Sequence, residues 1–327
     1  MTLSGLYQKF ENLNESFNDE KISYNVISIS KGNNHKLGCT KEGCPIFFIE
    51  CADSPNAANI KLKMIDVLFN QKCNLILKDI IIEDKDYCLV KLNNSQEDLV
   101  KYFLDVICLV LENLPSKPTI KCLTIELAKI IRLFTNLPSG SADSIQGLWA
   151  ELLVIEQSFN PDYLIKSWHV LKTDTHDFND GENKLEVKST CKNTRSHEFA
   201  LEQLNPNPNS QLIIASVQLT KTDMGCTLFD LEKKILNRIA DNECVIKLKN
   251  MILSTIGADL PTVKKIHFDY NQAKDSLVFF NYKDIPSIPV QAIPQCVSKV
   301  HFTIDLSGIK SILQCEVESP LYRSLGL

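Results

Sequence analysis

The sequence lacks the features of a secreted or membrane-anchored protein. None of its apolar runs approaches the roughly 18 residues that a membrane-spanning helix needs. Its first residues, MTLSGLYQKFENLNESFNDEK, contain neither the basic stretch nor the apolar run of a signal peptide. We therefore expect a cytoplasmic protein that does not associate with a membrane.

Paired cysteine motifs are also absent. The 12 cysteines are spread singly along the chain, with no CxxC pair and no matching histidine pair, which argues against a disulfide framework or a structural zinc site. The nearest pair, Cys39 and Cys44, has only Cys51 and His35 close by as further ligands. We expect reduced thiols that are mostly buried as small hydrophobic groups.

The chain has no excess of basic residues. Its formal net charge of -5 argues against a protein that coats nucleic acid by charge alone. One local exception is VKSTCKNTRSH, residues 187–197, which contains three basic residues and no acid. Within it, Lys192 and Arg195 are candidates for contacts with backbone phosphates, although a solvated loop would have the same composition.

No internal repeat or low-complexity tract is present, and 327 residues are more than one core usually holds. We predict an N-terminal strand-rich lobe followed by two helices at 1–138, a central core at 139–240, and a C-terminal helix and strand extension at 241–327. The lobe is expected to contain a strand at 24–30, one hairpin around Glu42-Gly43 and a second around Glu83 to Asp86. LPSGSAD, residues 137–143, is interpreted as a linker.

The central segment has the pattern of an α/β (α+β) core. We expect a helix at 143–159, then three strands, then a short helix or irregular element, and a fourth strand. The four strands are predicted at 163–171, 175–180, 183–190 and 211–220, with an Asn-Asp-Gly turn around Gly181. Two further helices, at 227–240 and near 244–257, and a closing group of strands, at 264–271, 276–285 and 300–306, are expected after it.

The stretch HDFNDGENKLEVKST, residues 176–190, carries the main chemical signal. Because side chains alternate along a strand, Glu186 and Lys188 should project together while Leu185 and Val187 point into the core. The hairpin should bring Asp177 alongside, at about 5 Å. This pattern leaves two interpretations open, a solvated charged hairpin and a metal-dependent phosphodiesterase centre.

The second interpretation has a physical basis. Two adjacent carboxylates repel unless a cation lies between them, and Mg²⁺, for which Mn²⁺ commonly substitutes, takes such hard oxygen ligands together with substrate phosphate. A metal held in this way can lower the pKa of a bound water and offset the charge that develops on the phosphorane. Lys188 would orient or activate the attacking water.

Three segments, GLWAELLVIEQ, HDFNDGENKLEVKST and HEFALEQL, together resemble the PD-(D/E)XK nuclease superfamily. Within it, they resemble the bacterial "PD-(D/E)XK motif protein" group, which is linked to restriction and phage-defence gene clusters. The resemblance is sharpest over residues 144–220 and extends more loosely to the hairpin GCTKEGCPIFF and to FFNYKDIPSIP. It implies a restriction-endonuclease-like mixed-sheet core of α-β-β-β-α-β order, which agrees with the order predicted above.

The resemblance also implies roles for individual residues. Asp177 is the first acid of the motif, Glu186 the second, and Lys188 its lysine. Glu151 corresponds to the extra acid that many relatives use to hold a metal-bound water or a second metal, although it could equally be a solvated helix residue. The implied metal site comprises Asp177, Glu186, Val187 and Glu151.

Two further positions follow from the resemblance. Gln203 lies where some relatives place a polar residue near the site, although a capping or surface glutamine would fit as well. His176 stands in place of the proline that gives the motif its name, and it either contacts phosphate or forms a hydrogen bond in the turn.

The function implied is that of a Mg²⁺-dependent DNA endonuclease in a bacterial restriction or anti-phage system. Because the net charge is acidic, affinity for DNA would come from a protein partner of the defence system or from a homodimer. The alternative is a catalytically inactive DNA-binding or scaffold subunit that keeps the nuclease fold.

Overall fold

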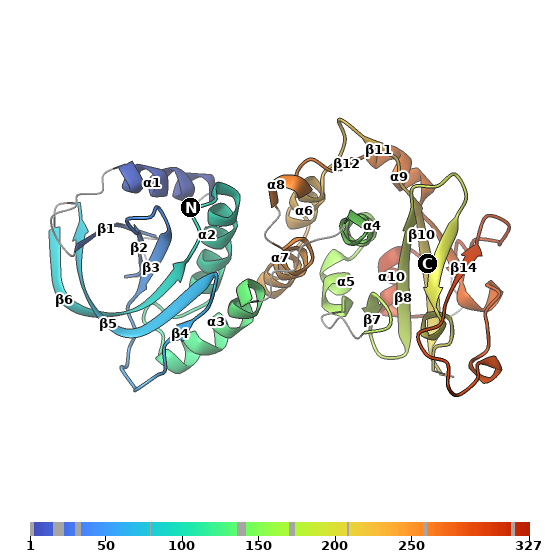
Figure 1. Ribbon diagram of the computed structural model, residues 1–327, viewed down its shortest axis with the longest axis horizontal. Coiled ribbons are helices and arrows are strands. Elements are labelled where there is room, and N and C mark those ends of the chain that lie inside the picture. Colours follow the sequence, from blue (N-terminus) through green and yellow to red (C-terminus); the bar gives the residue numbers. More distant parts are fainter. Residues whose placement is uncertain are drawn as a thin grey trace. The chain divides into compact units, whose positions relative to one another are not determined.

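The computed structural model describes residues 3–15, 23–29, 34–78, 80–135, 142–169, 174–207, 209–257, 260–314 and 318–327. The chain forms two units, Met1–Pro138 and Ser139–Leu327, and each mixes helices with strands (Figure 1). The fold is mixed α/β, as predicted, and is compatible with a restriction-endonuclease-like core. Most of the predicted linker at 137–143 lies outside the described residues. Within these ranges, every helix is too short or too polar to span a bilayer.

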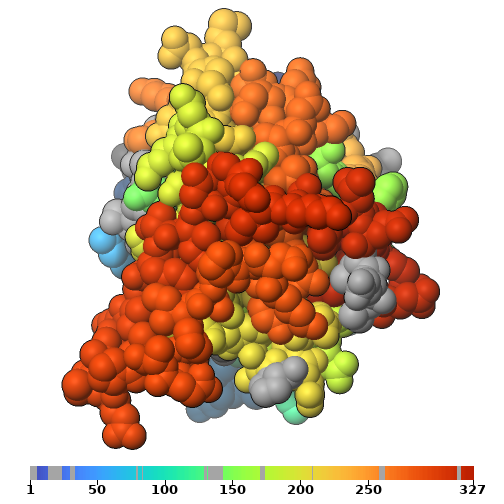
Figure 2. All heavy atoms as spheres, turned by 90° about the vertical axis from the view of Figure 1, so that its right-hand side faces the viewer, coloured from blue at the N-terminus to red at the C-terminus, as the bar shows by residue number. Residues whose placement is uncertain are grey.

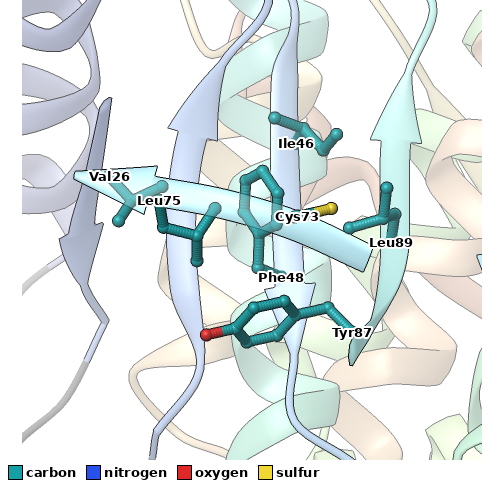
Figure 3. Packing of buried hydrophobic residues seen from close by; sticks show 7 residues of the cluster. All are labelled: Val26, Ile46, Phe48, Cys73, Leu75, Tyr87 and Leu89. Atoms are coloured by element: carbon teal, nitrogen blue, oxygen red, sulfur yellow. The ribbon is translucent and has the colours of Figure 1, made fainter. Parts of the chain in front are cut away.

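The first unit contains a sheet that closes on itself. Its described strands follow the order β1-β2-β3-β6-β5-β4, and β1 also pairs in parallel with β5. Seven buried residues, among them Phe48, Leu75 and Tyr87, pack between the strands (Figure 3). The strands are β1 (Ser23–Ser28), β2 (Lys36–Cys39), β3 (Pro45–Ile49), β4 (Ile60–Lys61), β5 (Ile65–Leu77) and β6 (Ile80–Leu92). The predicted hairpin around Glu42-Gly43 is confirmed, with Gly43 at a φ of 74°.

The predicted hairpin around Glu83 to Asp86 is wrong. Strands β5 and β6 pair along most of their lengths and turn between Leu77 and Ile80. The charged residues lie within β6, whose ladder with β5 continues through Lys85 and Asp86, and Asp84 forms an exposed 3.2 Å ion pair with Lys72 of β5. Register shifts in the ladder accommodate the irregular stretch.

Helices complete the first unit. The two predicted helices are confirmed as α2 (Glu97–Glu112) and α3 (Ile120–Thr135), and α1 (Leu3–Glu15) precedes the first strand. Helix α2 buries a broad apolar face. Two acids lie in its first turn, where their negative charges stabilise the helix by interacting with the positive end of its dipole. In this unit, as elsewhere in the described chain, the cysteines are free thiols.

A mixed four-stranded sheet forms the centre of the second unit. Its order is β13-β10-β8-β7, with β7 (Phe178–Asn179), β8 (Asn183–Thr190), β10 (Gln211–Gln218) and β13 (Val278–Asn281). Strand β8 runs parallel to β10 and antiparallel to β7. The interior residues of β10 are all buried, as expected of the apolar run at 211–220.

Helix α4 (Ala142–Gln157) packs against β8 and α6. Its Trp149 is buried and donates a hydrogen bond from Nε1 to the carbonyl oxygen of Cys226, at 3.1 Å. The helix predicted at 143–159 is therefore confirmed, and it brings Glu151 towards the sheet.

The strand predicted at 163–171 is wrong. Pro161–Ser167 form a helix, α5, and residues 170–173 lie outside the described chain. The side chain of Asn160 caps α5 by accepting a hydrogen bond from the Tyr163 amide, and Pro161 occupies the first turn. These start signals override the β-forming residues that follow them.

The short helix predicted before β10 is confirmed as a 3₁₀ helix, η1 (Leu201–Leu204). A second correction is that this polar stretch also contains a strand, β9 (Ser196–Ala200), which pairs antiparallel with β14 (His301–Asp305). Residues close to the C-terminus, drawn orange to red, cover this side of the unit (Figure 2). The other elements are β11 (Lys221–Thr222), α6 (Leu228–Leu236), α7 (Asn242–Ile256), α8 (Leu260–Val263), β12 (His267–Phe268), α9 (Tyr270–Ser276), η2 (Tyr282–Asp284), η3 (Val290–Ala292) and α10 (Pro320–Leu325).

Candidate active site

The β7–β8 hairpin positions the first acid of the predicted motif. Gly181 in its turn has a φ of 111°, a conformation that favours glycine. Phe178 pairs with Leu185, so Asp177 lies beside Glu186. One carboxylate oxygen of Asp177, Oδ2, accepts a hydrogen bond from the Val187 amide at 2.7 Å. The predicted neighbourhood of Asp177 and Glu186 is present in the structure.

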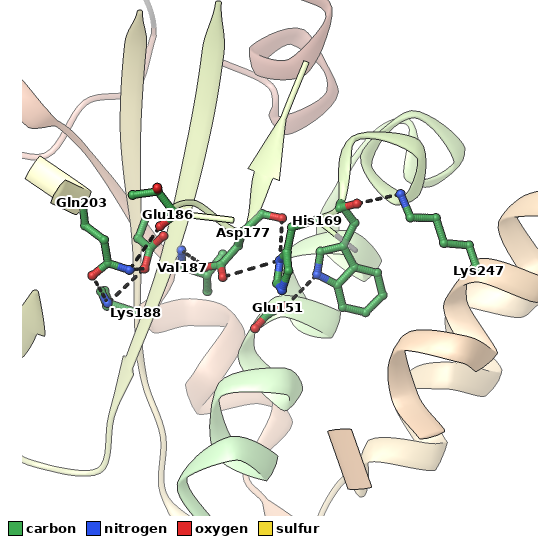
Figure 4. A network of polar contacts seen from close by, with 10 residues as sticks. Glu151, His169, Asp177, Glu186, Val187, Lys188, Gln203 and Lys247 are labelled. Carbon is green, nitrogen blue, oxygen red and sulfur yellow. Dashed lines mark hydrogen bonds and ion pairs between the residues drawn. The ribbon is translucent and has the colours of Figure 1, made fainter. Parts of the chain in front are cut away.

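Strand β8 presents the second acid and the lysine on the same face. The ammonium of Lys188 lies 2.9 Å from Oε1 of Glu186. Gln203, from η1, bridges this pair, because its Oε1 accepts from Lys188 at 2.9 Å while its Nε2 donates to Glu186. Figure 4 shows the three side chains converging at one end of a longer polar network.

Glu151 enters the other end of the same network from α4. Its Oε2 accepts a hydrogen bond from the indole Nε1 of Trp168 at 2.6 Å. Trp168 is itself buried and stacks on Phe178, with ring centroids 6.1 Å apart. Glu151 is thus not a solvated helix residue, and it lies close to Asp177 (Figure 4).

The site gathers more negative than positive groups. Burial raises the pKa of Glu186 to about 8, and the neighbouring Asp177 adds to the effect. Burial also raises the pKa of Glu151 well above 4.5, again with a contribution from Asp177, and it raises the pKa of Asp177. Lys188 opposes these shifts without cancelling them. The three carboxyl groups therefore either bind protons or share a metal cation.

The arrangement of free oxygen atoms fits a metal ion. Oε2 of Glu186 is buried and has no hydrogen-bond partner among the described residues. On the other side of Asp177, ligand atoms of Glu151, His169 and Asp177 all lie within 4.8 Å of one another. Val187 could contribute only its carbonyl oxygen, because its side chain is apolar and buried. The residues present are those that hold a hard divalent cation.

Two predicted nucleic-acid contacts are used inside the protein instead. His176 is buried, and its Nε2 lies 3.1 Å from the Gln203 carbonyl oxygen. Burial also lowers the pKa of His176 to about 4, so it is neutral at pH 7. Of its two predicted roles, the structure favours the hydrogen bond.

The guanidinium of Arg195 is also engaged internally. It donates hydrogen bonds to the carbonyl and hydroxyl oxygens of Ser216 and to the carbonyl oxygen of Ser276. It therefore links the segment before β9 to strand β10 and to the end of α9, and it is not a free phosphate ligand. Lys192 is exposed, so its predicted role stays open.

His169, which lies just after α5, is a site residue that no sequence motif indicates. Its backbone amide donates to the carbonyl oxygen of Asp177 at 2.8 Å, and its ring Nδ1 lies 3.0 Å from the same oxygen. A lone histidine in an apolar stretch carries no motif. The incorrect strand assignment at 163–171 also hid that His169 follows a helix, and its position beside Asp177 arises from the tertiary fold.

Comparison with known proteins gives one match. A family model described as "Putative PD-(D/E)XK family member, (DUF4420)" matches residues 6–307. The search of curated proteins found no match. The search of solved structures found none either.

Proposed function

Since the chain belongs to the DUF4420 family, we propose that it is a Mg²⁺-dependent endonuclease that hydrolyses DNA phosphodiester bonds as part of a bacterial restriction or anti-phage system. One observation carries this proposal. Asp177, Glu186 and Lys188 lie together at one edge of the sheet, and Glu186 keeps a buried oxygen without a partner.

Each side chain has a defined task in this proposal. Asp177 and Glu186 hold the divalent ion, and Glu151 lies beside Asp177 as a further acid. The bound ion would supply a water of lowered pKa and offset charge on the scissile phosphate. Lys188 is held by Glu186 and Gln203, so its ammonium is oriented before substrate arrives and can stabilise the same charge.

The charge of the chain suggests that it does not bind DNA tightly by itself. The net charge is -5, and Arg195 and His176 are used internally. Lys192 is the predicted phosphate contact that remains exposed. We propose that a protein partner or a second copy of this chain supplies the remaining affinity.

A cleavage assay tests the proposal. Purified protein is incubated with linear and circular DNA in Mg²⁺ or Mn²⁺, with and without the proteins encoded beside it. Cleavage should be lost in Glu186→Ala and Lys188→Ala. The matched control is Lys184→Ala, on the same strand, which should cleave as the wild type does.

Intact DNA under all of these conditions would refute the nuclease. If the protein still bound DNA, that result would favour the inactive DNA-binding or scaffold subunit. Cleavage that persisted in Glu186→Ala would refute the proposed site, because Glu186 is the second metal-binding acid in it.

A further inference from the structure

Glu151, His169 and Asp177 share a feature that goes beyond the predicted motif. Glu151 lies in α4, His169 lies two residues after the end of α5, and Asp177 immediately precedes β7. Figure 4 shows the three side chains converging. Each uses one polar atom to bind the protein. Trp168 donates to Oε2 of Glu151, the Val187 amide donates to Oδ2 of Asp177, and Nδ1 of His169 contacts the Asp177 carbonyl oxygen.

Among the described residues, hydrogen bonds engage Oε2 of Glu151, Nδ1 of His169 and Oδ2 of Asp177, and Oδ1 of Asp177 lies 4.0 Å from Nδ1 of His169. For His169 the contact also decides the tautomer. A carbonyl oxygen can only accept, so Nδ1 carries a proton in this contact, and Nε2 is the ring nitrogen that remains for a metal. Metal-binding histidines commonly have this arrangement, with one ring nitrogen donating to a carbonyl oxygen and the other on the metal.

The spacing also fits one ion. One carboxylate oxygen each of Glu151 and Asp177 and one ring nitrogen of His169 lie within 4.8 Å of one another. Three ligand atoms spread evenly around an ion, each about 2.1 Å from it, would be roughly 3.6 Å apart. The three atoms therefore have to approach one another by up to about 1.2 Å to bind one ion, a movement that side-chain rotation can supply.

We propose that His169 is a metal ligand through Nε2, together with Asp177 and Glu151, and that the site consequently binds Mn²⁺ and related transition ions more tightly than Mg²⁺. The chemical reason is the nitrogen ligand. Mg²⁺ takes oxygen ligands almost exclusively, whereas imidazole suits first-row transition metals. This inference rests on the proposed function, since Asp177 belongs to both.

The backbone around His169 is held firmly enough for such a role. Trp168 forms a β-bridge with Phe178. The ammonium of Lys247, from α7, donates to the carbonyl oxygens of Lys166 and Trp168, at 2.9 and 2.6 Å. These contacts fix the end of α5 and the residue before His169, so the ring faces Asp177 before any metal binds.

Pulsed electron paramagnetic resonance of Mn²⁺ bound to the full-length chain tests the ligand directly. We expect modulation from a coordinated ¹⁴N nucleus in the wild type, and its loss in His169→Gln, which offers oxygen in place of nitrogen. The matched control is His301→Ala, an exposed histidine on β14. Bound Mn²⁺ without ¹⁴N coupling in the wild type would overturn the inference, and this measurement does not depend on whether a variant folds.

Competition between the two ions tests the preference. We expect His169→Gln to weaken Mn²⁺ binding by at least about tenfold, the loss that removal of an outer-sphere partner already causes in metal sites. Mg²⁺ binding should change less, so the Mn²⁺-to-Mg²⁺ affinity ratio should fall. An unchanged ratio would overturn the inference.

The two proposals can fail separately. DNA cleavage in Mg²⁺ together with bound Mn²⁺ that shows no ¹⁴N coupling would refute the histidine ligand and leave the nuclease standing. Coupling to ¹⁴N without cleavage of any DNA would support the ligand and refute the nuclease.

Discussion

Gln203 links Lys188 to Glu186. It accepts from Lys188 and from the Ala200 amide, and it donates to Glu186. We expect Gln203→Ala to slow DNA cleavage by about tenfold to 100-fold, as loss of an outer-sphere partner does. The free energy of unfolding should fall by only about 1 kcal/mol.

Single-turnover cleavage rates and urea unfolding measure the two effects of that substitution. Glu202→Ala is the matched control, because Glu202 is exposed on the same short helix. An unchanged cleavage rate in Gln203→Ala would show that Lys188 and Glu186 do not need the bridge.

Arg195 should matter for stability and not for DNA. Its guanidinium is half-buried and binds oxygen atoms of Ser216 and Ser276. Since hydrogen bonds to charged groups contribute about 1.5–3 kcal/mol, we expect Arg195→Ala to lower the free energy of unfolding by about that amount, measured in urea. A variant as stable as the wild type would contradict the internal role.

Lys192 should behave in the opposite way. It is exposed, so Lys192→Ala should change the free energy of unfolding by no more than about 0.5 kcal/mol. If it contacts a phosphate, DNA affinity should fall, and the slope of log affinity against log salt concentration should decrease by about 1. Fluorescence anisotropy across a salt series measures that slope, and an unchanged slope would place Lys192 away from the DNA.

At the scale of the element, the stability of helix α5 depends on its N-terminal cap, Asn160. The Asn160 side chain accepts from the Tyr163 amide at 3.1 Å, and replacing such a cap by alanine costs about 1 kcal/mol. We expect Asn160→Ala to destabilise the second unit by that amount and to speed amide exchange in residues 161–169. Asn193→Ala, in an exposed loop, is the control. Unaltered exchange would mean that Lys247, at the other end, is sufficient to hold the helix.

The extent to which the sequence predicts the structure also differs between elements. Strand β8 was predictable because its polar and apolar residues alternate, and the Gly181 turn then brought Asp177 beside Glu186. Burial of Glu186 was not predictable, since a period of two places it on the polar face. That burial arises because η1 places Gln203 over the same face.

Long-range pairing explains the remaining differences. Strand β9 forms only because β14, about 100 residues later, pairs with it, and nothing local in SHEFA indicates that partner. His169 was missed for a related reason. Its importance comes from Asp177 and Glu151, which lie on other elements, so only the assembled fold identifies it.

At the scale of the whole molecule, the two units should respond differently to acid. In the first unit, His35 is fully buried with both ring nitrogens unpartnered among the described residues. Burial lowers its pKa from 6.5 to about 4, against the attraction of Glu50 and with the help of Lys36. In the second unit, burial lowers the pKa values of His176 and His197 to about 4 in the same way. There, however, the raised pKa values of the buried carboxyls Glu186, Glu151 and Asp177 act in the opposite direction and offset that loss.

The sign follows from proton uptake. The unfolded chain takes up a proton at His35 near pH 6.5 and the folded chain only near pH 4, so the free energy of unfolding of the first unit is highest above pH 6.5. It should fall by roughly 3 kcal/mol as the pH decreases to about 4. His35→Leu should remove most of this dependence, because leucine fills the site without a titrating group. His301→Leu, at an exposed position, should not.

The measurement can separate the units because both tryptophans, Trp149 and Trp168, belong to the second. Tryptophan fluorescence therefore follows that unit alone, while amide exchange in residues 34–92 follows the first. Between pH 7 and 4.5, amide exchange in the first unit, once it is corrected for the intrinsic effect of pH on exchange, should show that the stability of this unit falls. The urea midpoint measured by tryptophan fluorescence, which reports the second unit, should shift less over the same range. Equal shifts in both signals, or an undiminished pH dependence in His35→Leu, would show that His35 does not control the acid response of the first unit.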